Sequence, residues 1–177
     1  MTLQEEYELS CYRVLDRLWD DKEVYLVRHV ETGKLFIKQR VYEHLSRLDI
    51  SGVPKIYLCV EQEKKLVVIE EYIHGETLEE YLEKKEIMGE DEAVSMIIQL
   101  CRILKQLHRC RSPIIHRDLK PANIMISSDG VVKLIDFNAA KEYRMGQMED
   151  TCLMGTREYA APEQYGFGQS DARTDIY

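Results

Sequence analysis

The stretch His116-Arg117-Asp118-Leu119-Lys120-Pro121-Ala122-Asn123 decides the fold, because it gathers polar and ionisable side chains into one short loop. Apolar residues flank it on both sides. Ile114-Ile115 before the loop and Ile124 to Ile126 after it are typical of very short strands. A polar loop carried by strands on either side is a common location for binding and catalytic residues. The stretch therefore predicts a functional loop.

A second polar loop begins at Asp136-Phe137-Asn138 and ends at Ala161-Pro162-Glu163. The run Val131 to Ile135 predicts a short strand before it, preceded by the turn Ser127-Ser128-Asp129-Gly130. Upstream, the strand-like run Leu35-Phe36-Ile37-Lys38 ends in a lysine. Asp and Asn favour loops because their side chains bond nearby backbone groups, so any one of them alone is weak evidence for a functional site. The order and spacing of these segments together are the stronger evidence.

Together these segments resemble the protein kinase family, and within it the serine/threonine kinases of the short bacterial type. The first loop fits H-R-D-L-x-x-x-N, the second supplies D-F-x and A-P-E in order, and the lysine strand resembles the strand of the phosphate-binding lysine. The resemblance implies an α+β, two-lobed fold with a small antiparallel-sheet N-lobe containing one helix and a mostly helical, incomplete C-lobe. It implies one kinase domain over 1–177, with the N-lobe and hinge start in 1–72 and a partial C-lobe in 73–177.

The resemblance implies ATP-dependent transfer of the γ-phosphate to a protein serine or threonine hydroxyl, with Mg²⁺ as the metal. Asp118 would accept the hydroxyl proton, and Lys120 would contact the γ-phosphate. Asn123 and Asp136 would hold Mg²⁺ with hard oxygen ligands. A lysine at position 120 is similar to serine/threonine kinases rather than tyrosine kinases, and Thr156 agrees.

The same resemblance implies the nucleotide contacts of the N-lobe. Lys38 would contact the α- and β-phosphates, with Glu43 as a candidate partner for the lysine. The backbone of Glu71 and Ile73 would bind adenine at the hinge. Glu70 falls at the gatekeeper position, where the family usually has an apolar residue.

Three features depart from the family pattern. No glycine precedes Gly33, so the glycine-rich loop that covers the phosphates is missing, and the acids within Leu18 to Glu23 would repel phosphate there. Leucine spacing places Val41 rather than Glu43 at the position of the family glutamate. Asn138 replaces the glycine of D-F-G, a milder change because asparagine tolerates left-handed backbone.

Two alternative functions stay open from the sequence. A pseudokinase acting as a nucleotide-binding interaction module is favoured by the missing glycine loop. A small-molecule phosphotransferase of kinase-like fold is disfavoured by Ala161-Pro162-Glu163. Thr151 is a candidate phosphorylation site, because a phosphate there could pair with the guanidinium of Arg117.

Composition limits the partners. The 177 residues carry 24 Lys+Arg and 32 Asp+Glu, a formal charge of −8, which argues against holding nucleic acid by a net positive field. No run approaches the roughly 18 apolar residues of a membrane span, and the N-terminus lacks a secretory signal. We therefore expect no nucleic acid partner, no membrane span and a cytoplasmic location. Five cysteines without a C-x-x-C pair predict reduced thiols.

Periodicity predicts the elements around these loops. The N-terminal half predicts strands and one short helix, and the stretch after Gly75 predicts helices, the longer of which has an apolar stripe at Val94, Ile97, Cys101, Leu104 and Leu107. The predicted strands cover 12–18, 24–30, 35–38, 54–57 and 66–69, and the predicted helices cover 41–48, 77–84 and 91–108.

The last residues, Ser170 to Tyr177, resemble the beginning of the large C-lobe helix, so we expect that helix to be missing from this chain. Residues 1–177 alone should then be marginally stable, prone to aggregate and nearly inactive, because the apolar stripe of the long helix lacks a partner. A thermal melt and an autophosphorylation assay measure this. A sharp cooperative melt together with robust turnover would contradict the expectation.

Overall fold

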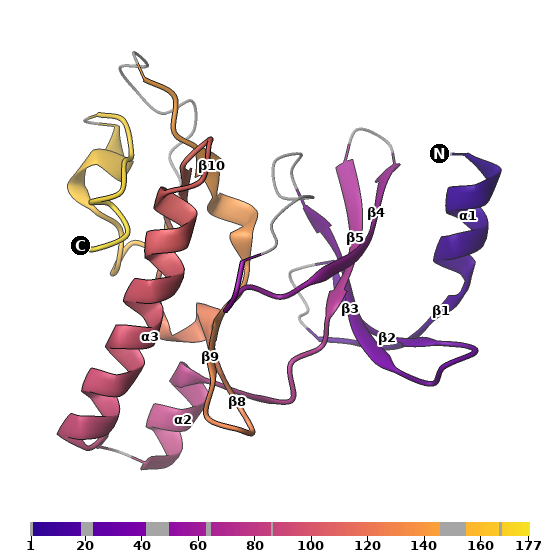
Figure 1. Cartoon of the computed structure of the whole chain (residues 1–177), viewed down its shortest axis with the longest axis horizontal. Coiled ribbons are helices and arrows are strands. Elements are labelled where there is room, and N and C mark those ends of the chain that lie inside the picture. The colour runs from indigo at the N-terminus through magenta and orange to yellow at the C-terminus, as the bar shows by residue number, and fades with distance from the viewer. Residues whose placement is uncertain are drawn as a thin grey trace. The chain divides into compact units, whose positions relative to one another are not determined.

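The computed structural model describes residues 2–18, 23–41, 50–62, 65–85, 87–145, 155–166 and 168–177. The chain divides into two compact units. Unit 1 comprises Met1–Asp49 and Pro54–Ile73, and unit 2 comprises Ile50–Val53 and His74–Tyr177. Figure 1 shows the sheet of unit 1 and the two longer helices of unit 2. The expected α+β class, with an antiparallel sheet in the first unit, is confirmed.

Unit 1 is built on a five-stranded antiparallel sheet in the order β1-β2-β3-β5-β4. The predicted strands are confirmed to within a few residues, except that β4 begins at Ile56, after Pro54, because proline has no N–H to donate to a ladder. The strands are β1 (Tyr12–Arg17), β2 (Val24–His29), β3 (Leu35–Val41), β4 (Ile56–Gln62) and β5 (Lys65–Glu71).

The two faces of this sheet carry different clusters. One face packs Val27, Phe36 and Ile69, with four partly buried side chains against them: Leu9, Tyr12, Tyr25 and Leu58. The other face packs Leu66 and Val68, with Ile56 and Cys59 against them. Side chains of a strand alternate between the faces, so the strand register assigns each residue of β3 and β5 to one cluster or the other.

A helix that the sequence analysis missed precedes the sheet. α1 (Leu3–Ser10) begins with a capping box, in which Thr2 and Glu5 bond each other's backbone N–H groups. Its Leu9 packs on the cluster of Val27, and this Thr-x-x-Glu spacing was the available sequence signal. The predicted helix over 41–48 is wrong at Val41, which ends β3. Its remainder, with Glu43, lies outside the described residues.

Unit 2 contains both predicted helices, α2 (Leu78–Lys85) and α3 (Glu90–His108). The predicted strands are β7 (Ile114–Ile115), β8 (Ile124–Ser127) and β9 (Val132–Leu134), and the sequence analysis missed β6 (Gly75–Thr77) and β10 (Lys141–Glu142). The strands form two small sheets, β6-β8-β9 and β10-β7, and α3 packs on β7 and β9 (Figure 1).

The buried stripe of α3 differs from the predicted one. Leu104 and Leu107 are buried as expected, whereas Val94, Ile97 and Cys101 are exposed. Because α3 packs on β7 and β9, it buries a different set of side chains. These are Met96, Leu100, Ile103, Leu104 and Leu107. Within the described part of the chain, no helix has both the length and the apolar content to span a bilayer.

Gly75 gives a test of the β6–β8 pairing. A Cβ at this position would lie 2.1 Å from the carbonyl oxygen of Ile126 and 2.8 Å from Cα of Ser127. Gly75→Ala should therefore lower the free energy of unfolding by about 1–3 kcal/mol, because backbone cannot move aside cheaply. The control is Gly168→Ala, whose Cβ would only touch Glu163 at 3.7 Å and should change stability by less than about 0.5 kcal/mol. Equal melting temperatures for the two variants would contradict the close packing.

Candidate active site

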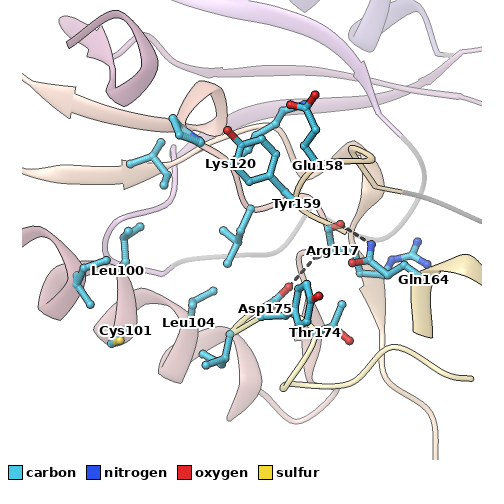
Figure 2. Close-up of a pocket in the computed structure, with 16 residues that line it drawn as sticks. Leu100, Cys101, Leu104, Arg117, Lys120, Glu158, Tyr159, Gln164, Thr174 and Asp175 are labelled. Carbon is cyan, nitrogen blue, oxygen red and sulfur yellow. Dashed lines mark hydrogen bonds between the residues drawn. The ribbon is translucent and has the colours of Figure 1, made fainter. Parts of the chain in front are cut away.

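Asp175 fixes the start of the polar loop 116–123. Its carboxylate, 5% exposed, accepts the backbone N–H of His116 at 2.9 Å and that of Arg117 at 2.8 Å. His108, in the last turn of α3, contacts the same carboxylate through Nε2 at 2.8 Å. Figure 2 shows Asp175 beside Arg117. The last residues of the chain are thereby bonded to the start of the polar loop.

Arg117 has an unusual backbone that several contacts hold in place. Its φ of 66° lies in the left-handed region, which disfavours any residue with a Cβ. Nε2 of Gln164 donates to the Arg117 carbonyl at 2.7 Å, and Arg117 Nε donates to the Ala139 carbonyl at 2.6 Å (Figure 2 shows the Gln164 contact). The sequence analysis missed Gln164, for which the position next to A-P-E was the sole signal. These bonds over-determine the conformation of the residue before Asp118.

His116 supports the loop and takes no direct part in the site. Burial lowers the pKa of His116 more than the nearby Asp175 charge raises it, so the imidazole is neutral. Its Nε2 lies 3.2 Å from the carbonyl oxygen of Ile135, and its ring packs edge-on against Phe137 at 4.8 Å between centroids. The histidine thus packs under the loop that carries Asp136.

Asp118 is the centre of a compact polar cluster. Its Oδ1 accepts the backbone N–H of Thr156 at 3.0 Å and the Thr156 hydroxyl at 2.7 Å. Its Oδ2 accepts Nδ2 of Asn123 at 2.9 Å and lies 3.2 Å from Nζ of Lys120. Burial would raise the pKa of Asp118, but the hydrogen bonds from Thr156 and Lys120 and the lysine charge outweigh it and lower the pKa. The carboxylate is therefore ionised at neutral pH.

Lys120 and Thr156 extend this cluster. Lys120 Nζ donates to the Thr156 hydroxyl at 2.7 Å, and that hydroxyl in turn donates to Asp118. The chain of donors runs from a cation through a hydroxyl to an anion, so each bond strengthens the next. The structure thus brings together two predicted residues, Asp118 and Lys120, with the threonine that the sequence analysis cited for substrate class.

Asn123 and Asp136 are placed by the β8–β9 pair. Ile124 pairs with Leu134, and Ile135 donates to the Asn123 carbonyl at 2.9 Å, so both predicted metal ligands stand at the same end of two neighbouring strands. Asn123 is buried and its Nδ2 is committed to Asp118, which leaves Oδ1 as the oxygen that it can offer a cation. One carboxylate and one amide oxygen suit Mg²⁺, which also takes waters and phosphate oxygens as ligands.

The predicted nucleotide residues lie in unit 1, away along the chain from the Asp118 cluster of unit 2. Lys38 is half-buried on β3, where it pairs with Ile69. Glu71 ends β5, its backbone N–H donates to the Lys55 carbonyl at 2.8 Å, and its carboxylate accepts the Lys55 N–H at 3.2 Å. Ile73 is buried. Their contacts with a nucleotide stay predictions.

A hollow of about 410 Å³ lies beside the polar loop within unit 2 (Figure 2). Apolar side chains of α3 line one wall, among them Leu100 and Leu104, and Ile176 and Tyr177 line another. Lys120 reaches its rim. The exposed Ile97 and Cys101 belong to the same wall, so part of the apolar surface of α3 faces this hollow.

Comparison with known proteins agrees with this geometry. The protein kinase domain family matches residues 21–177, and the chain therefore belongs to that family. A probable serine/threonine-protein kinase of Clostridium perfringens is 37% identical over 111 residues, which cover 62% of this chain and 16% of that protein. One from Dictyostelium discoideum is 32% identical over 150 residues, covering 81% and 32%. The resemblance to serine/threonine protein kinases is thereby confirmed.

A third relative, the probable serine/threonine-protein kinase PknB of Lactococcus lactis, is 33% identical over 134 residues, which cover 75% of this chain and 21% of that protein. The matches thus span a third or less of each of these three relatives.

The hydroxyl of Thr156 gives a direct test of the Asp118 cluster. Thr156→Val removes one hydrogen bond to the carboxylate, so the pKa of Asp118 should rise and its titration midpoint should move to a higher pH than in the wild type. Carboxyl ¹³C NMR during an acid titration measures this. Thr156→Ser keeps a hydroxyl and should titrate like the wild type, and a Val variant that also does so would contradict the assigned bond.

Proposed function

We propose that this protein is an ATP- and Mg²⁺-dependent serine/threonine protein kinase. The observation that supports this most is the cluster in which Thr156, Lys120 and Asn123 all bond one carboxylate, that of Asp118. Such a cluster puts a hydrogen-bond acceptor, a cation and an amide within reach of one reacting hydroxyl, which is what in-line phosphate transfer needs.

Asp118 would act as the acceptor of the hydroxyl proton. Its lowered pKa keeps it ionised at neutral pH, so its oxygens can orient the hydroxyl and take the proton as the bond to phosphorus forms. Lys120, 3.2 Å from Asp118, would balance negative charge on the γ-phosphate. The hydroxyl of Thr156 bonds both Asp118 and Lys120 and so fixes the positions of these two side chains relative to each other.

Asn123 and Asp136 would hold Mg²⁺, because they present oxygen ligands at the same end of β8 and β9. When bound, the metal neutralises and orients the phosphates. The backbone of Asp136 is in the left-handed region with φ 59°, and its carboxylate accepts the Asn138 N–H at 3.3 Å. This bond directs the Asp136 carboxylate within its turn.

The backbone of Glu71 and Ile73 would bind adenine. The Glu71 N–H already bonds Lys55, so the carbonyl of Glu71 and the N–H of Ile73 are the groups that we assign to the base. The net charge of −8 supports a protein rather than a nucleic acid as substrate. The absence of a bilayer-spanning helix among the described residues is compatible with action in the cytoplasm.

Substitutions of Asp118 and Asp136 should have different effects, because the two aspartates have different roles in this mechanism. In the full-length protein, Asp118→Asn and Asp136→Asn should each lower phosphate transfer to a protein substrate by at least about 100-fold, because each removes a charge that the transition state needs. Asp136→Asn should also weaken Mg²⁺-ATP binding. The matched control is Asp129→Asn in the exposed turn between β8 and β9, which should keep full activity. Near-normal transfer by either site variant would contradict the kinase assignment.

A further inference from the structure

The side of α3 that faces away from the core of unit 2 carries a regular row of exposed residues. Val94 and Ile98 are 52% and 45% exposed, although both are apolar. The exposed residues repeat at steps of three and four, which places them on one line along a helix, and we call this line the α3 seam: Asp91, Val94, Ile98, Cys101 and Lys105. Such spacing is typical of a helix face that packs on another helix.

The α3 seam is apolar in the middle and oppositely charged at its two ends. Asp91 lies in the first turn of the helix, and Lys105 lies in the last turn, near the exposed Arg102 and Arg109. None of these four side chains forms an ion pair or a side-chain hydrogen bond within the described residues. Glu92, by contrast, pairs with Lys85 of α2. The charges of the seam are therefore available to a partner of opposite charge.

A second copy of the same seam has the complementary chemistry. In an antiparallel pair of helices related by a two-fold axis at Ile98, Ile98 meets its own counterpart. Asp91 and Lys105 each lie seven residues from Ile98, so each Asp91 meets Lys105 of the other copy. The same contact then occurs twice, as it does in any closed two-fold interface. A parallel pair would place Asp91 against Asp91 and Lys105 against Lys105, so charge repulsion selects the antiparallel arrangement.

Other partners fit the α3 seam less well. An anionic membrane would attract Lys105 but would repel Asp91 on the same line of the helix. An acidic peptide would likewise leave Asp91 without a partner. A second copy satisfies both ends of the seam at once, and it covers the exposed Val94 and Ile98 between them.

We propose that the α3 seam joins two copies of this protein, with the helices antiparallel and the two-fold axis beside Ile98. One face of one helix covers less surface than the roughly 800 Å² per partner of a standard interface. We therefore expect weak, reversible association, with a dissociation constant on the order of 100 µM. The association is independent of the proposed kinase function, because no residue of the Asp118 cluster belongs to the seam.

Sedimentation equilibrium of the full-length protein tests the charge pairing. Lys105→Glu places two carboxylates together at each end of the interface and should weaken association by at least about tenfold. Adding Asp91→Lys to Lys105→Glu reverses both charges and should restore the wild-type dissociation constant to within about threefold. The matched control is Lys34→Glu, which makes the same charge change in the exposed turn between β2 and β3 and should associate like the wild type. A thermal melt of each variant checks its fold.

Disulfide trapping tests the position of the axis without altering the charges. In a Cys101→Ser background, Ile98→Cys should form a covalent dimer on mild oxidation, because its two copies meet at the axis. Val94→Cys is the matched control on the same exposed face. Its two copies would stand about 12 Å apart along the helices, beyond the reach of a disulfide, so it should form at least about fivefold less covalent dimer.

Four results would overturn the proposal. Three of them are association that Lys105→Glu leaves unchanged, a folded double variant that does not regain association, and equal trapping at positions 94 and 98. The fourth is a wild-type protein that stays monomeric at about 500 µM, well above the expected dissociation constant, while it binds vesicles containing phosphatidylserine. That result would assign the α3 seam to a membrane surface. Neither measurement involves ATP, so failure here would be distinguished from failure of the kinase assignment.

Discussion

The carboxylate of Asp175 is the constraint on which the rest of the site depends. It accepts two backbone N–H groups, those of His116 and Arg117, in a place where neither carboxylate nor amide meets solvent. A left-handed backbone at a residue such as Arg117 costs about 1–3 kcal/mol, whereas each hydrogen bond to a buried charge contributes about 1.5–3 kcal/mol. The two bonds outweigh the strain, so the chain can turn sharply just before Asp118.

This turn allows the carboxylate of Asp118 to form hydrogen bonds with several partners. With Arg117 in the left-handed region, Asp118 meets Thr156 on one oxygen and Asn123 and Lys120 on the other. Gln164 closes the arrangement by bonding the Arg117 carbonyl, and it is itself held by the N–H of Ala161. The buried amide of Gln164 thereby links the A-P-E segment to the polar loop, although the two are distant in sequence.

The sequence predicted much of this because local patterns set the local structure. The strands of the sheet in unit 1 and both helices of unit 2 follow from alternation and helical spacing. The buried face of α3 could not be predicted from the sequence, because several apolar stripes fit the same helix. Only its packing on β7 and β9 selects one of them. The role of Gln164 depends on a contact between distant segments, which no local pattern encodes.

Unit 2 keeps the sequence pattern of the kinase family more closely than unit 1 does. The difference follows from the kind of interaction that stabilises each unit. Unit 2 retains its polar network complete, because removing one partner from a buried cluster such as that of Asp118 leaves a charge without compensation. Unit 1 holds its sheet together by two apolar clusters, one on each face, and apolar packing tolerates substitution better than a buried charge does. Substitutions of polar residues can therefore accumulate in the sheet of unit 1 without disturbing the Asp118 cluster of unit 2.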